Sequence, residues 1–187
     1  MILRERLFTV GEYHRMAAAG VISPDERVEL LNGRIVPMNA LGYRHVACVN
    51  DLAEWLYSHI LEHAIVSVQN SMDLDDMSEP QPDIVLFKRR EDRYRHHLPT
   101  AADVLLLIEV CDTTEAKDRE VKLPLYASAG VPEAWLVSLA NHFVDVFRQP
   151  QGDAYQIVTR YYPPSESIPF SFAPETPIPL SVFLPAQ

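Results

Sequence analysis

The sequence predicts an α/β or α+β domain in which one helix precedes a sheet and another crosses over inside it. Apolar residues recur at helical spacing from about 42 to 63, and short runs rich in β-branched residues follow. A second helical segment, at 115–129, separates two groups of such runs. The length of 187 residues is typical of one domain whose hydrophobic core needs no disulfide bonds or structural metal ions for stability. We expect an N-terminal helix and hairpin at 8–37, a core at 42–162 and a proline-rich tail at 163–187.

The composition is that of a soluble globular protein, with 48% hydrophobic and 22% charged residues. Sixteen Lys+Arg against 26 Asp+Glu give a net charge of −10, which argues against holding nucleic acid by charge alone. A metal ion can still recruit phosphate to an acidic site. The two cysteines form no CxxC pair, no apolar run approaches the roughly 18 residues of a membrane span, and no signal peptide is apparent. A reducing cytoplasm is therefore the expected location.

The N-terminal extension carries two local signals. Thr9 and Glu12 have the spacing of a capping box, which predicts a short helix that ends near Gly20. Residues 28–36 predict a hairpin around Asn32-Gly33, because Asn-Gly favours a two-residue turn. Period-two alternation would place successive residues of the first strand on opposite faces.

The core begins with the helix that the sequence predicts best, from about 42 to 63. Strands are expected at 65–68, 84–87 and 104–108, and the last of these is continuously apolar, as a strand buried on both faces should be. The apolar stripe of the helix is expected to comprise Val46, Val49, Ala53, Leu56 and Ile60.

The second half of the core contains the crossover and further strands. Pro124 should kink the crossover helix at 115–129 or confine its regular part to one side. Strands are expected at 134–137, 143–147 and 154–161.

The tail from 163 to 187 holds seven of the fifteen prolines, so an extended and irregular conformation is expected. It also holds Phe170, Phe172 and Phe183, more apolar surface than a solvated terminus needs. We expect the tail to pack over the core or at a homodimer interface.

Two carboxylates stand at the ends of apolar strands. Asp83 opens the strand at 84–87, and Glu109 ends the run at 104–108. A carboxylate at the end of a buried strand is costly unless a cation or hydrogen-bond donors compensate it. Either residue alone could point into solvent or pair with an arginine. Together, on neighbouring strands, they favour a shared divalent cation, which prefers oxygen ligands.

Two further residues have an ordinary and a functional interpretation. Lys122, on the crossover, could fold back over the strand end and orient a water molecule. Its spacing fits a surface lysine paired with Asp118 better. Glu29, beside the hairpin turn, is expected to be exposed unless it converges with Asp83 and Glu109.

The remaining candidates favour structural roles. The segment 88–97 holds five of the sixteen Lys+Arg, but interleaved acidic residues favour a solvated loop over a phosphate-binding surface. His45 could approach the site or cap its helix locally, and the local role is favoured. Cys111 is expected to be a small buried thiol. The sequence contains no GxGxxG, P-loop, HExxH or GxSxG motif, which disfavours dinucleotide, nucleoside-triphosphate, zincin and α/β-hydrolase chemistry.

Four segments, in order along nearly the whole chain from about Phe8 to Leu184, resemble the Uma-two family. They are VELLNGRI at 28–35, EPQPDIVL at 79–86, LLIEV at 106–110 and DREVKLPLYASAGVPEAWLV at 118–137. The family belongs to the PD-(D/E)xK nuclease superfamily of restriction endonuclease-like proteins. The resemblance implies a restriction endonuclease-like core with a mixed central sheet flanked by helices.

The resemblance also implies roles for residues. Asp83 and Glu109 match the motif carboxylates, and would hold Mg²⁺ (or Mn²⁺), with the carbonyl of Val110 as a further ligand. The ExK pattern would place a lysine at 111, where this chain has Cys111. The lysine of this family lies on the crossover helix and matches Lys122, and Glu29 matches the hairpin glutamate.

Two functions follow as hypotheses. The first is a Mg²⁺-dependent endonuclease acting on DNA, with Glu29, Asp83, Glu109 and Lys122 as its catalytic set. The alternative is a non-catalytic dimeric module that keeps the nuclease fold and binds another protein. Whether the four side chains converge on one cavity discriminates between them.

Overall fold

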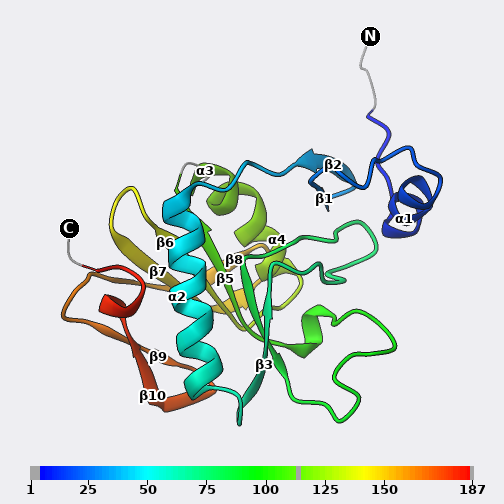
Figure 1. Cartoon of the computed structure of the whole chain (residues 1–187). Helices are drawn as coiled ribbons and strands as arrows, with labels where there is room; N and C mark the ends of the chain where they lie inside the picture. The colour runs from blue at the N-terminus through cyan, green and yellow to red at the C-terminus, as the bar shows by residue number, and fades with distance from the viewer. Residues whose placement is uncertain (1–4, 113–114, 186–187) are drawn as a thin grey trace.

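The computed structural model describes residues 5–112 and 115–185. Its centre is a mixed sheet, seen behind α2 in Figure 1. The sheet has six strands in the order β3-β4-β5-β6-β7-β8. Only β5 and β6 pair in parallel, and the other neighbouring pairs are antiparallel. The strands are β3 (Ala64–Val68), β4 (Ile84–Lys88), β5 (Val104–Cys111), β6 (Glu133–Ser138), β7 (Phe143–Gln151) and β8 (Ala154–Tyr161).

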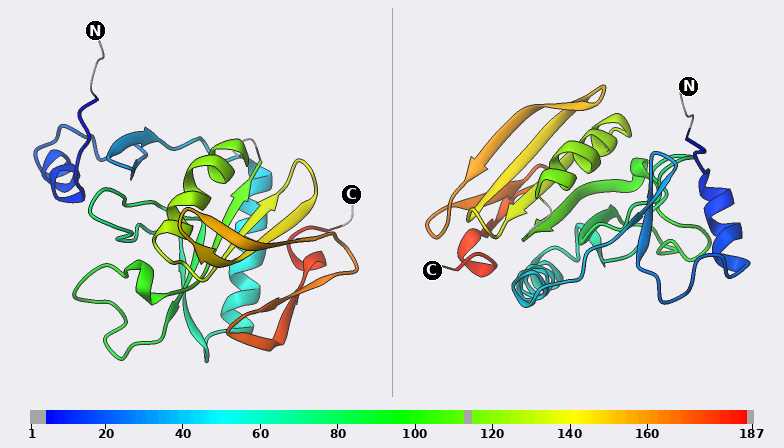
Figure 2. Two further views of the ribbon diagram at one scale, coloured as in Figure 1. Left: turned by 180° about the vertical axis from the view of Figure 1, so that it is seen from behind. Right: turned by 90° about the horizontal axis from the view of Figure 1, so that it is seen from above.

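Both faces of the sheet are covered, as Figure 2 shows from above. Helix α2 (Tyr43–His59) and the C-terminal segment cover one face, and the crossover with α4 (Leu123–Ser128) covers the other. This burial explains the continuous apolar run of β5, whose side chains enter a hydrophobic core on either side. The mixed sheet flanked by helices confirms the predicted fold class.

The N-terminal extension has the predicted elements. Thr9 and Glu12 form the capping box of α1 (Val10–Ala18). Strands β1 (Val28–Leu31) and β2 (Arg34–Pro37) are joined by Asn32 and Gly33, whose φ angles of 49° and 74° are those of the predicted tight turn. The two faces of β1 are not distinguished by burial, because Glu29, Leu30 and Leu31 are all buried.

Helix α2 confirms the predicted helix, with two corrections. It ends at His59 rather than near 63. Val46 is 41% exposed, so its assignment to the apolar stripe is wrong. Val49, Leu56 and Ile60 are buried as expected, and Ala53 is partly buried. His45, Cys48 and Leu52 are buried as well, so the buried face extends to one side of the expected stripe.

The crossover is divided into three consecutive segments rather than forming one helix. A short turn, α3 (Glu115–Lys117), leads into a π-helical turn, η2 (Asp118–Lys122), and then α4. Pro124 lies in the first turn of α4, directly after the π-helical turn, in which the N–H of Leu123 donates to the carbonyl of Asp118. The expectation that Pro124 confines the regular helix to one side is thereby confirmed.

The prediction of an irregular tail is wrong. Strands β9 (Ser167–Phe170) and β10 (Ala173–Pro179) pair antiparallel, and a 3₁₀ turn, η3 (Leu180–Val182), follows. A register shift between Ala173 and Ile178 accommodates the proline-rich β10. The expectation that the tail packs over the core is confirmed, because Phe170 and Phe183 are buried in the core that contains α2. A second 3₁₀ turn, η1 (Ala101–Asp103), precedes β5.

Candidate active site

The pairing of β4 with β5 brings two carboxylates together. Ile84 lies opposite Ile108, and continuing that antiparallel register by one residue puts Asp83 opposite Glu109. Both side chains belong to the sheet face under the crossover, since Val85 and Leu107 on the same alternation lie in the core on that side. The backbone N–H of Val110 donates to Asp83 Oδ2 at 2.9 Å, which ties the two strand ends to each other.

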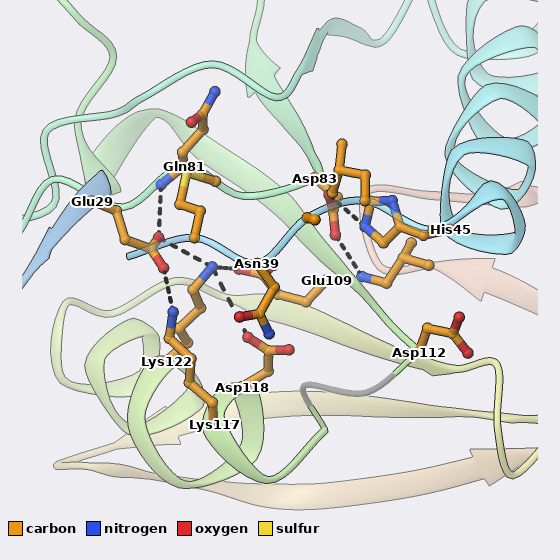
Figure 3. Close-up of a pocket in the computed structure, with 15 residues that line it drawn as sticks. Glu29, Asn39, His45, Gln81, Asp83, Glu109, Asp112, Lys117, Asp118 and Lys122 are labelled. Carbon is orange, nitrogen blue, oxygen red and sulfur yellow. Dashed lines mark hydrogen bonds and ion pairs between the residues drawn. The ribbon is translucent and has the colours of Figure 1, made fainter. Parts of the chain in front are cut away.

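A cavity of about 190 Å³ lies over these strand ends (Figure 3). Its walls come from β1, the segment between β2 and α2, the ends of β4 and β5, and the crossover. The polar residues in its wall are Glu29, Asn39, His45, Gln81, Asp83, Glu109, Asp112, Lys117, Asp118 and Lys122. All four residues of the predicted catalytic set therefore line one cavity.

Asp83 is held from several sides. His45 Nε2, from α2, lies 2.9 Å from Asp83 Oδ1, and the amide of Gln69 donates to the same oxygen at 3.2 Å. Because an ionised carboxylate only accepts hydrogen bonds, His45 presents Nε2–H to it. The other ring nitrogen, Nδ1, is buried without a hydrogen-bond partner among the described residues. His45 thus belongs to the site, contrary to the expectation of a role local to its helix.

Glu109 is buried beneath the crossover. Lys122 Nζ lies 3.1 Å from Glu109 Oε1, and the hydroxyl of Tyr126 donates to the same oxygen at 2.5 Å. Burial raises the pKa of Glu109 to about 8, although the positive charge of Lys122 acts in the opposite direction. A cation entering the cavity would favour the ionised carboxylate.

Lys122 is not the surface lysine that its spacing favours, since it is only 4% exposed. Its ammonium group contacts Glu109, Glu29 at 3.2 Å and Asp118 at 4.0 Å. Burial lowers the pKa of Lys122, but the surrounding carboxylates outweigh that effect and raise it. Lys122 is therefore a charged group fixed inside a ring of acidic side chains.

Glu29 is buried as well and lines the same cavity as Asp83 and Glu109, so of its two interpretations the exposed one does not apply. Its Oε1 accepts a hydrogen bond from Lys117 Nζ at 2.9 Å, and its Oε2 accepts one from the backbone N–H of Gln81 at 3.3 Å. Because Oε2 also contacts Lys122, both oxygens are already engaged by protein groups. Glu29 is therefore well placed to hold Lys117 and Lys122 in position.

The donor set suits a hard divalent cation. No three His, Cys, Asp or Glu side chains within 5–112 and 115–185 form a compact metal site. However, Mg²⁺ retains several waters and is commonly held by one or two carboxylates. Asp83 and Glu109 supply two carboxylates at one cavity, and Val110 lines the same space. The residues present therefore fit such an ion in ligand type.

Several site residues escaped the sequence analysis. Lys117 and Gln69 lie outside the four motif segments, and Gln81 and Tyr126 lie inside two of them but were not singled out. All four reach the site through tertiary contacts. Cys111 is the expected buried thiol, and its Sγ donates to Asp118 Oδ2 at 3.0 Å.

The basic segment 88–97 is mostly exposed, as expected for a solvated loop. It begins at Lys88, the end of β4 opposite Asp83, and contributes nothing to the cavity wall.

No helix in the part of the chain that the structure describes is both long enough and apolar enough to cross a membrane.

The fold has a counterpart among solved structures. A crystal structure titled "putative nuclease belonging to DUF820", from Anabaena variabilis ATCC 29413, superposes with a TM-score of 0.73 at 18% identity, covering 95% of this chain and 97% of that chain. Residues 10–180 match the Uma2 family, described as "Putative restriction endonuclease". This chain belongs to the Uma2 family, as the sequence motifs predict. No curated protein matches it.

Proposed function

We propose that this protein is a metal-dependent nuclease that hydrolyses phosphodiester bonds in DNA. The observation that carries the proposal is the placement of Asp83 opposite Glu109 at one cavity, with Lys122 Nζ 3.1 Å from Glu109. Membership of a family described as "Putative restriction endonuclease" and the fold shared with a structure titled "putative nuclease" support it.

In this proposal Asp83, Glu109 and the carbonyl of Val110 hold Mg²⁺, with Mn²⁺ as a substitute. Such an ion supplies stabilisation of negative charge on the phosphoryl group and an acidified water. His45 and the N–H of Val110 fix the orientation of Asp83 beforehand.

Lys122 and Glu29 complete the proposed catalytic set. Lys122 orients the attacking water and offsets developing negative charge with a preorganised ammonium group. Glu29 acts through Lys122, because it holds the ammonium group from the side opposite Glu109. Glu29 is accordingly a positioning residue.

The test is cleavage of duplex DNA, single-stranded DNA and RNA by the purified chain with Mg²⁺, Mn²⁺ or EDTA. The expected result is metal-dependent cleavage of DNA that Glu109→Gln abolishes and that Glu54→Gln, on the exposed side of α2, leaves intact. Cleavage that survives Glu109→Gln would point to a contaminating nuclease or a different site.

Two observations favour a non-catalytic protein-binding module as a second candidate. Glu29 and Glu109 form ion pairs with lysines of the chain itself, and the chain carries a net charge of −10. A wild-type protein that cleaves none of the three nucleic acids with either metal would favour this module.

A further inference from the structure

Two of the three lysines of this acidic chain meet at one carboxylate. Lys117 Nζ lies 2.9 Å from Glu29 Oε1, and Lys122 Nζ lies 3.2 Å from Glu29 Oε2. The third lysine, Lys88, is at the far end of β4 and hydrogen-bonds to the carbonyl of Ala102. With so few lysines, their concentration in the cavity wall calls for a physical reason.

The π-helical turn at 118–122 explains how the two lysines share one partner. Residues five apart on an α-helix are separated by roughly 140° around the axis, so they face different directions. A π-turn closes i→i+5 hydrogen bonds and brings residues five apart closer to alignment. Lys117 immediately precedes this turn and Lys122 ends it. The irregular turn thus aims both ammonium groups at Glu29.

The two lysines differ in accessibility. The side chain of Lys122 is 6% exposed and that of Lys117 is 28% exposed. Lys117 donates one hydrogen bond to Glu29, and an ammonium group carries three donors. Lys117 therefore lies at the opening of the cavity with donors that an entering ligand can reach.

The cavity wall carries more negative than positive charge, so a polyanion can bind there only if an accessible cation offsets the repulsion. The wall contains five carboxylates against two lysines, and Lys122 is enclosed by three of the five. A phosphodiester backbone would meet net negative charge there unless cations at the opening offset it. The acidic residues of the wall are Glu29, Asp83, Glu109, Asp112 and Asp118.

We propose that Lys117 is a substrate-binding residue that contacts a backbone phosphate next to the one that is cleaved. This proposal rests on the nuclease function proposed above. Glu29 then positions two lysines with separate tasks: Lys122 faces the reacting group, and Lys117 holds the strand. The ligand class is a polynucleotide with at least one phosphate flanking the cleaved bond.

The experiment compares wild type with Lys117→Met, Lys117→Arg and a matched control, Lys88→Met. Binding of a fluorescein-labelled DNA duplex is followed by anisotropy at several salt concentrations with Ca²⁺ in place of Mg²⁺, and cleavage kinetics are measured with Mg²⁺. In Lys117→Met the slope of log K against log salt should fall by about one, because one phosphate contact is lost. KM should rise on the order of tenfold with kcat little changed, Lys117→Arg should restore both values, and Lys88→Met should match wild type.

Other results would overturn the proposal. If wild type binds or cleaves DNA and Lys117→Met leaves both the salt slope and KM unchanged, Lys117 is no substrate contact. A lower thermal midpoint in Lys117→Met with an unchanged slope would leave it only a structural role. Absence of both binding and cleavage in wild type would refute the nuclease function itself, which distinguishes the two failures.

Discussion

The ammonium group of Lys122 lies 3.1 Å from Glu109 Oε1 and 3.2 Å from Glu29 Oε2, so buried charged contacts fasten the crossover to the end of β5 and to the hairpin. The sequence separation of thirteen residues is bridged by the crossover segment folding back over the sheet. Removing one member of a buried pair leaves an uncompensated charge and typically costs about 3–5 kcal/mol. That cost separates a buried site lysine from a surface one.

We predict that Lys122→Met destabilises the metal-free protein by about 3–5 kcal/mol, against about 0.5 kcal/mol for a surface lysine. Its nuclease activity should fall by ~10²–10³, as expected for loss of one preorganised charged group. Thermal unfolding and a gel-based cleavage assay measure the two effects, with Lys88→Met as the matched control. Wild-type activity in Lys122→Met would contradict the role given to this lysine.

Binding of Mg²⁺ or Mn²⁺ should raise the thermal midpoint, because a ligand that binds only the folded state stabilises it. Combining Asp83→Asn with Glu109→Gln should abolish this rise, since both carboxylate ligands are lost. Lys122→Met should retain the rise or enlarge it, because the cation then has no competing ammonium group. An equal rise in the double variant would remove Asp83 and Glu109 as metal ligands.

Part of the site could be predicted from the sequence, because local patterns reveal where the strands begin and end. Asp83 and Glu109 each adjoin an apolar run, and the pairing of those runs brings them together. The burial of Lys122 and Glu29 could not be predicted in the same way. It depends on a π-turn and on the docking of the hairpin over the sheet, neither of which has a local sequence signal.

The fold shows the same division between local and tertiary information. The capping box of Thr9 and the turn at Asn32 depend on neighbouring residues, and both were predictable. The structure of the tail from 163 onward could not be predicted in this way. Its prolines indicated irregular chain, yet β9 and β10 form a hairpin because burial of Phe170 against the core compensates for weak strand propensity.

The tail should contribute strongly to stability. The ring of Phe170 stacks on Trp135 with centroids 5.2 Å apart, and its centroid lies 6.1 Å from that of Trp55 of α2. We predict that Phe170→Ala costs about 3–5 kcal/mol, the usual loss for deleting a buried aromatic ring. Denaturant unfolding measures this loss, with Phe172→Ala, at a partly buried site, as a milder comparison. A loss below 1 kcal/mol would mean that the tail docks only loosely.

A homodimer stays a prediction, but the tail no longer motivates it, because Phe170 and Phe183 are covered by the chain's own core. The edge strand β8 is the better candidate surface, since it pairs with β7 alone and exposes 53% of Val158. Sedimentation at micromolar concentration should show a dimer that Val158→Lys dissociates. A wild-type monomer would contradict the prediction.

The last prediction concerns acid stability and the anchoring of the crossover. Asp145, on β7, accepts two hydrogen bonds from Arg160 at 2.7 and 2.8 Å and one from Arg119 of the π-turn at 2.7 Å. Burial alone would raise the pKa of Asp145, but the hydrogen bonds from the two arginines outweigh it and lower the pKa. The crossover that carries the site lysines is thereby tied to the sheet through an ionised carboxylate.

Because the pKa of Asp145 is lower in the folded state, its ionisation stabilises the protein above the unfolded-state pKa of about 3.9. That contribution is lost as the pH falls through the folded-state value. Asp145→Asn should therefore lose about 2 kcal/mol at pH 7, the scale of hydrogen bonds to a charged group when the partners are partly exposed. The gap between wild type and Asp145→Asn in thermal midpoint should stay constant from pH 8 to pH 5 and narrow at about pH 3, while the exposed control Asp51→Asn follows wild type throughout. If the difference in thermal midpoint stays constant down to about pH 2, side-chain packing rather than the charge of Asp145 holds the crossover to β7.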